Sequence, residues 1–199
     1  MVRKKTNQYT LVANDIETIK RKINNNNNIV AASKNPKDQC YSACTYIYQL
    51  FKKENVKLTF ILLLYWEKKA NDDVPMDHYV AVFDIDGYQF VVDPTIKQMV
   101  DKSKHVKNML NILNITKPND KNIFYGEIEQ WKKKMLHAIG SSKHTIRYRE
   151  FETLRLAKIT LDNHDHLSPE KFSGKSLKRN PLLSERSWFN SLTDKVTGV

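Results

Sequence analysis

The sequence is poor in cysteine, and this limits the kinds of covalent and metal chemistry that it can carry. Its 199 residues include only Cys40 and Cys44. Two cysteines four residues apart on one helix have poor geometry for a disulfide, and they are too few for a zinc site without histidines nearby. The pair of histidines around Asp165 (residues 164–166) lies in a polar stretch without other obvious ligands. We therefore expect reduced thiols, no metal and no other cofactor.

Long apolar runs are absent as well. The longest mostly apolar run, Leu58–Trp66, has nine residues, whereas a membrane-spanning helix needs about 20. No apolar segment follows the basic N-terminus, so we expect no cleaved secretion signal. A protein of this kind stays in the cytosol or is exported by a route that needs no such signal.

Positive charge is plentiful. The chain has 33 Lys and Arg against 22 Asp and Glu, a net charge of +11. A basic surface is most often simply solvated, but it also suits nucleic acid, an anionic membrane surface or an acidic protein. Nucleic acid ranks lowest, because no zinc finger or RNA-binding aromatic motif accompanies the charges. A non-catalytic basic binding module therefore stands as one alternative to an enzyme.

The apolar pattern predicts an α+β fold. Cys40, Cys44, Ile47 and Phe51 share one face of a predicted helix, with Asp38 as its N-cap. A buried strand (57–66), a second strand (78–85), a tight turn at Asp86-Gly87 and a third strand (88–92) should follow, the last two as an antiparallel hairpin. Helices are expected over 103–113 and 127–139, and the stretch 145–160 fits a strand followed by either a helix or a second strand.

Three residues in this pattern match the needs of a thiol enzyme. A thiol nucleophile is activated by a helix N-terminus and by a histidine, which then protonates the leaving amine. A carboxylate orients that histidine. Cys40 opens the predicted helix, His78 opens the first hairpin strand 38 residues later, and Asp93 follows the second strand 15 residues after His78.

The hairpin should bring two of these residues together. Residues equidistant from a turn at Asp86-Gly87 face each other, which pairs position 78 with position 95; an offset of about two residues sets Asp93 beside His78. Each residue alone has an ordinary structural explanation, and Cys44 fits one as a packing residue. The order and spacing of the three together predict a Cys-His-Asp triad.

Four segments then resemble one family, the papain-like bacterial toxin and effector deamidases. The similarity is to the C-terminal catalytic domain of the Pasteurella mitogenic toxin and its Salmonella effector relative, and it covers roughly residues 28–135. One departure is Tyr41, which stands where tryptophan is commoner after the cysteine. The similar segments are DQCYSA (38–43), DHYVAV (77–82), VVDPTIKQ (91–98) and FYGEIEQW (124–131).

This resemblance implies a fold, an activity and a partner. The fold is a papain-like core, with the catalytic helix packed on a small antiparallel sheet and further helices. Gln98 would help to build the oxyanion site. The implied activity is deamidation of a glutamine in a host regulatory protein, with heterotrimeric G-protein α subunits as the substrate class. The chain would then be a secreted bacterial effector or toxin that acts in the host cytosol.

The resemblance also suggests how the chain is divided. We expect a polar N-terminal segment (1–27). From its composition, the asparagine run 24–28 is expected to be a flexible surface loop. A papain-like catalytic domain (28–160) and a basic C-terminal extension (161–199) follow. The triad itself does not distinguish deamidation from peptide hydrolysis or transglutamination, so a cysteine protease or transglutaminase remains the nearest alternative.

Overall fold

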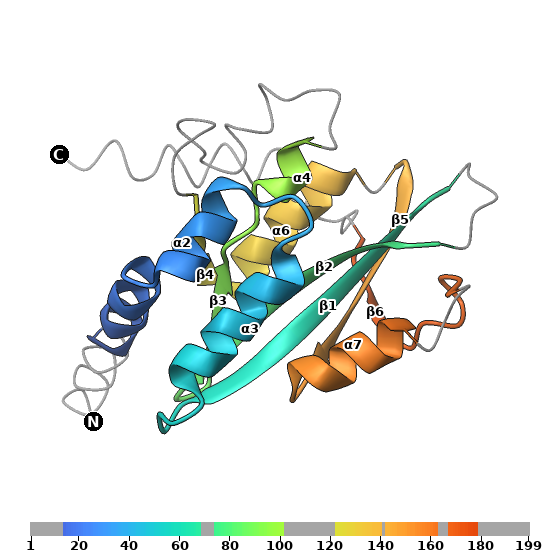
Figure 1. Cartoon of the computed structure of the whole chain (residues 1–199). Coiled ribbons are helices and arrows are strands. Elements are labelled where there is room, and N and C mark those ends of the chain that lie inside the picture. The colour runs from blue at the N-terminus through green and yellow to red at the C-terminus, as the bar shows by residue number, and fades with distance from the viewer. Residues whose placement is uncertain (1–13, 69–73, 102–121, 141, 163–166, 179–199) are drawn as a thin grey trace, which may run out of the picture.

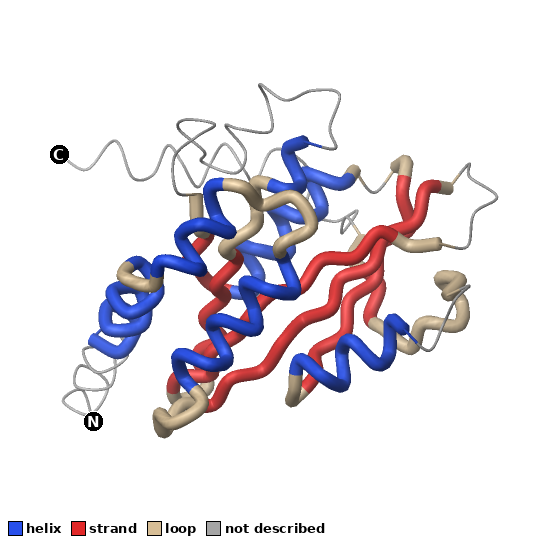
Figure 2. The backbone as a smooth tube through the Cα atoms, in the orientation of Figure 1, coloured by secondary structure: helices blue, strands red, loops and turns tan. Residues whose placement is uncertain are grey.

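The fold is α+β and is built on one antiparallel sheet of six strands, in the order β4-β3-β2-β1-β5-β6 (Figure 1; Figure 2). The computed structural model describes residues 14–68, 74–101, 122–140, 142–162 and 167–178. The strands are β1 (Lys57–Glu67), β2 (Met76–Ile85), β3 (Tyr88–Asp93), β4 (Phe124–Glu127), β5 (His144–Phe151) and β6 (Lys175–Ser176). The helices are a segment within 14–24, α2 (Asn27–Lys34), α3 (Cys40–Phe51), α4 (Gln98–Asp101), α6 (Ile128–Ile139) and α7 (Leu154–Asp162).

Helices cover both faces of the sheet. In Figure 1, α3 and α7 lie in front of the strands and α6 lies behind them. Side chains of β1 alternate between the two cores: Leu62 and Leu64 pack with α3 and α7, while Ile61 and Leu63 pack with α4 and α6. Since β1 is buried on both faces, its sequence is a continuous apolar run rather than an alternating one.

The asparagine run is not a surface loop, and that expectation was wrong. Only residues 25 and 26 separate the helix within 14–24 from α2. The Asn26 side chain caps α2 by accepting hydrogen bonds from the backbone N–H groups of Asn28 and Ile29, both at 3.1 Å. Asparagine is among the best N-cap residues, so one member of the run starts a helix.

The helix that carries Cys40 starts where the pattern predicted, but its cap differs. The N-cap is Gln39, whose side chain makes no capping hydrogen bond. Asp38, the expected cap, has a left-handed backbone with φ of 56°, a conformation that aspartate tolerates better than most residues. No side chain therefore caps the first-turn N–H groups of α3.

The structure decides one further prediction about secondary structure, while several others fall outside the described residues. The ambiguous stretch 145–160 is a strand, β5, followed by a helix, α7. The predicted helix 103–113, the histidines at 164 and 166 and most of the C-terminal extension lie outside the described residues. Within the described part, none of the helices combines the length and the apolar character that crossing a membrane requires.

Candidate active site

His78 and Asp93 meet inside the protein, on neighbouring strands. The Nε2 atom of His78 lies 2.8 Å from Oδ2 of Asp93, and both side chains are fully buried. A carboxylate only accepts hydrogen bonds, so Nε2 carries the proton and donates it to Asp93. The side chains therefore lie in the arrangement that the hairpin spacing predicted.

The two strands of the hairpin, β2 and β3, pair without the expected shift in register. Asp86 and Gly87 have φ values of 51° and 84°, as a two-residue type I′ turn requires. Ala81 pairs with Val92, and the same register sets position 78 opposite position 95. The predicted offset of two residues was thus wrong. Asp93 reaches His78 diagonally across the strands, a separation that side chains of this length span.

Asp93 is held by two further hydrogen bonds. Its Oδ1 atom accepts one from the backbone N–H of Thr95 at 3.1 Å, and its Oδ2 atom accepts one from the indole N–H of Trp131 at 3.0 Å. Trp131 comes from α6, on the face of the sheet opposite α3, and is completely buried. Three donors on two oxygens fix the orientation of the carboxylate, and through it the imidazole.

Cys40 is the third residue of the predicted triad. It is the first residue of α3 and is 5% exposed. Because Nε2 of His78 faces Asp93, the ring presents Nδ1 to its remaining neighbours, and this buried atom has no hydrogen-bond partner among the described residues. Interaction with the Cys40 thiol is one of the effects that raise the pKa of His78. Cys40 is therefore near enough to the ring to influence its charge.

The electrostatics of the site favour a charged imidazole. Burial opposes the charge, but the negative charge of Asp93, its hydrogen bond and the interaction with Cys40 outweigh burial and raise the pKa of His78 to about 10. An imidazolium next to a thiol stabilises the thiolate form by Coulomb attraction. The site therefore favours the charged form of the His78 imidazole.

The second cysteine has a different environment. Cys44 lies one turn inside α3 and is completely buried. Burial, followed by the proximity of Cys40 and Asp93, raises the pKa of the Cys44 thiol well above its ordinary value. It packs in the core with Ile47 and Phe51, which agrees with its assignment as a packing residue.

Gln98 lies near the pair in the chain, although the structure shows no contact between them. It opens α4, five residues after Asp93, and is 4% exposed. Its Oε1 atom is buried without a hydrogen-bond partner, as is the hydroxyl of Thr95 in the same loop and that of Tyr79 on β2. Buried polar atoms without partners are costly, so the hydrogen-bonding capacity of these groups is unmet in the free protein.

Trp131 is the site residue to which the sequence analysis gave no role. It belongs to the segment FYGEIEQW, and its buried position on one face of α6 is typical of a core residue. The only available signal is that a buried indole N–H usually finds an acceptor. Among the described residues, no group of three or more potential metal ligands comes together.

Comparisons with known proteins agree with this architecture. A family model described as dermonecrotoxin of the papain-like fold matches residues 35–189. The catalytic domain of the Salmonella virulence factor SseI has a similar solved structure, with a TM-score of 0.62 and 18% sequence identity, covering 89% of this chain and 94% of that one. No curated protein matches the sequence. The family match spans more than half of the chain, which therefore belongs to the dermonecrotoxin family of the papain-like fold.

Proposed function

We propose that this protein is a protein-glutamine deamidase of the bacterial toxin and effector type, with Cys40, His78 and Asp93 as its catalytic residues. The observation that carries the proposal is the buried His78 ring, whose Nε2 binds Asp93 at 2.8 Å and which interacts with the Cys40 thiol at the start of α3. A nucleophile, a general acid and base, and an orienting carboxylate are the three groups that acyl transfer needs.

In the first half of the reaction, the Cys40 thiolate attacks the carboxamide carbon of a target glutamine. The oxyanion that forms faces the uncapped N–H groups of the first turn of α3 and, in this proposal, the Gln98 side chain. The His78 imidazolium gives its proton to the nitrogen, the C–N bond breaks, and ammonia leaves a thioester on Cys40.

In the second half, water replaces ammonia. The neutral His78 ring takes a proton from a water molecule, whose oxygen attacks the thioester carbon. Collapse of this intermediate breaks the C–S bond, restores the thiolate–imidazolium pair and releases glutamic acid, which ionises. Asp93 keeps Nε2 in place throughout, because two other donors, Thr95 N–H and the Trp131 indole, hold its carboxylate.

The substrate in this proposal is a host regulatory protein, namely a heterotrimeric G-protein α subunit. The papain-like toxin family supports a protein target, and the resemblance of the segments 38–43, 77–82 and 91–98 to the toxin and effector deamidases supports this class of substrate. The same proposal has the protein secreted from a bacterium and active in the host cytosol. The +11 net charge suits an acidic face on such a target or an anionic membrane beside it.

The test is intact-mass spectrometry of a purified G-protein α subunit after incubation with the protein or with its Cys40→Ala variant. Deamidation through an acyl-enzyme adds about 1 Da without breaking the chain, and peptide mapping locates the changed glutamine. Cys40→Ala should leave the mass unchanged. Fragments would show a protease, a larger increase with an added amine would show a transglutaminase, and an effect that survives in Cys40→Ala would show a binding module.

A further inference from the structure

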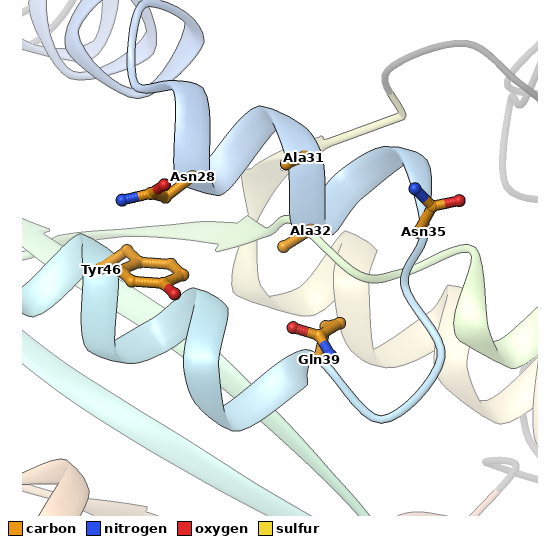
Figure 3. Close-up of a pocket in the computed structure, with 6 residues that line it drawn as sticks. All are labelled: Asn28, Ala31, Ala32, Asn35, Gln39 and Tyr46. Atoms are coloured by element: carbon orange, nitrogen blue, oxygen red, sulfur yellow. The ribbon is translucent and has the colours of Figure 1, made fainter.

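A hollow lies between α2 and α3, on the side of α3 where Gln39 stands (Figure 3). Its volume is about 280 Å³. In Figure 3, Asn28 of α2 lies above the ring of Tyr46, and Ala32 points into the gap between the two helices. We call this hollow the α2–α3 groove; its lining residues are Asn28, Ala31, Ala32, Asn35, Gln39 and Tyr46.

The groove is lined by polar groups that have no hydrogen-bond partner among the described residues. Within the described part of the chain, the side-chain amides of Asn28, Asn35 and Gln39 and the hydroxyl of Tyr46 make no hydrogen bond. An amide side chain both donates and accepts hydrogen bonds, as a peptide unit does. Such a lining therefore complements the backbone of another polypeptide.

The absence of charge on the lining residues further limits the kinds of ligand that suit the groove. None of the six lining residues is ionised at neutral pH, although the chain as a whole carries a net charge of +11. An uncharged wall offers no ion pair to an acidic or basic side chain, and bringing such a charge out of water without a partner is costly. The occupant that fits best is uncharged.

Position and size connect the groove to the proposed reaction. Gln39 lines the groove and directly precedes Cys40, so one end of the groove lies one residue from the nucleophile along the chain. Tyr46 lies seven residues further along the sequence, or about 10 Å along the helix axis, which is the length of about three extended residues. The volume of about 280 Å³ is slightly below the roughly 300–1,000 Å³ of pockets that hold whole small-molecule ligands.

We infer that the α2–α3 groove binds an uncharged, extended segment of the substrate protein, about three residues long, next to the glutamine that enters the active site. The inference rests on the proposed deamidase function and adds to it a rule of specificity. The target glutamine should be followed or preceded by a short extended stretch without charged side chains, whose backbone binds the amides of α2 and the start of α3.

A second hollow of about 430 Å³ has a different character and provides a control. It lies beside the far half of α3 and contains an ion pair between Lys22 and Glu54, with the nitrogen and oxygen 2.7 Å apart. Asn25 also lines it. A substitution of Asn25 therefore changes the same residue type as a substitution of Asn28, but in a hollow that lies away from Cys40.

The experiment compares Ala31→Trp, which fills the groove, with Asn27→Trp, which places the same bulk on an exposed position of α2 outside the groove. The substrate is a purified G-protein α subunit, followed by mass spectrometry, and the rate of Cys40 alkylation by iodoacetamide reports on the active site itself. We expect Ala31→Trp to lower kcat/KM about tenfold through KM, with an unchanged alkylation rate. Asn27→Trp should leave both unchanged.

Equal kcat/KM for the two variants would overturn the inference while leaving the proposed function intact. No deamidation by the unaltered protein would instead overturn the proposed function, and the inference with it. If Ala31→Trp lowers the melting temperature, Asn28→Ala and its control Asn25→Ala replace the pair. Loss of one hydrogen bond of about 1 kcal/mol should then lower kcat/KM about fivefold for Asn28→Ala alone, and equal effects at both positions would again reject the groove.

Discussion

Trp131 and His78 bind the same oxygen atom of Asp93. The indole nitrogen lies 3.0 Å and the imidazole Nε2 2.8 Å from Oδ2, and all three side chains are fully buried. The two donors come from α6 and β2. Helix α6 therefore helps to fix the orientation of the His78 imidazole, although it packs on the face of the sheet opposite α3. Trp131 is thus a positioning residue that acts through Asp93.

Removal of this indole donor should slow catalysis without removing any catalytic group. Trp131→Phe keeps an aromatic ring in the core and leaves one hydrogen bond to the Asp93 carboxylate unmade. Hydrogen bonds to charged groups are worth about 1.5–3 kcal/mol, so we expect kcat to fall at least about tenfold. KM should change little because Trp131 is completely buried. Steady-state deamidation of the α subunit measures both constants.

The matched control is Trp66→Phe. Trp66 is also buried and donates its indole N–H, at 2.6 Å, to the backbone carbonyl of Leu167. Its loss should lower the melting temperature and leave kcat unchanged, since this hydrogen bond ties the C-terminal segment to β1. A loss of kcat that is the same in both variants would mean that Trp131 acts through stability alone.

His78 should remain protonated well above neutral pH. Burial lowers its affinity for a proton, but Asp93 and Cys40 raise the pKa to about 10, against about 6.5 for an unperturbed histidine. We expect the ¹³Cε1 resonance of His78, assigned by its loss in His78→Gln, to keep its imidazolium shift through pH 8. Titration near the ordinary histidine value would contradict the charged pair.

The same shift predicts how stability depends on pH. A folded-state pKa above the unfolded one stabilises the folded protein fully below pH about 6.5, and that contribution is lost as pH rises towards about 10. The free energy of unfolding, from urea titrations at pH 6.5, 8 and 9.5, should therefore fall with pH. Asp93→Asn removes the charge that raises the His78 pKa, so its stability should fall less over the same range.

Local patterns in the sequence predicted the parts of the site that depend on local structure. The turn at Asp86-Gly87 fixed the hairpin and hence the approach of Asp93 to His78, because a two-residue turn sets the register of both strands. The role of Trp131 depends instead on how α6 packs behind the sheet, a long-range contact that periodicity does not encode. Gln98 was named through resemblance alone.

The start of α3 shows a second limit. An aspartate two residues before a helical pattern is a strong capping signal, yet Asp38 takes a left-handed conformation and the cap passes to Gln39. Side-chain preference cannot decide which residue of a turn adopts positive φ when neighbouring packing competes with it. The predicted cap was thus one residue too early, whereas Cys40 lies in the first turn of the helix, as predicted.

The two cysteines should differ in reactivity. Iodoacetamide reacts with thiolates, and burial raises the pKa of the Cys44 thiol, whereas Cys40 stands beside the His78 imidazolium at a helix N-terminus. We expect rapid alkylation of Cys40 and slow alkylation of Cys44 at pH 7, measured by peptide mass spectrometry. Cys44→Ala is the control, since it should leave the rate at Cys40 unchanged. Equal, slow labelling of both thiols would argue against the triad.

Gln98 gives the sharpest test of the oxyanion site. If its carboxamide donates to the oxyanion, Gln98→Ala should lower kcat about 10²-fold, the usual cost of losing one such donor. Gln98→Glu should be slower still, because a carboxylate repels the oxyanion.

Neither Gln98 variant removes a member of the triad, so the alkylation rate of Cys40 should stay high in both. Gln89→Ala, a half-buried glutamine on β3, serves as the control and should keep full kcat. The donor to the oxyanion would be the Nε2–H of the Gln98 amide, so the prediction rests on the family resemblance and not on the buried, unpartnered Oε1. If Gln98→Ala kept full kcat, the oxyanion would depend on the backbone N–H groups of α3 alone.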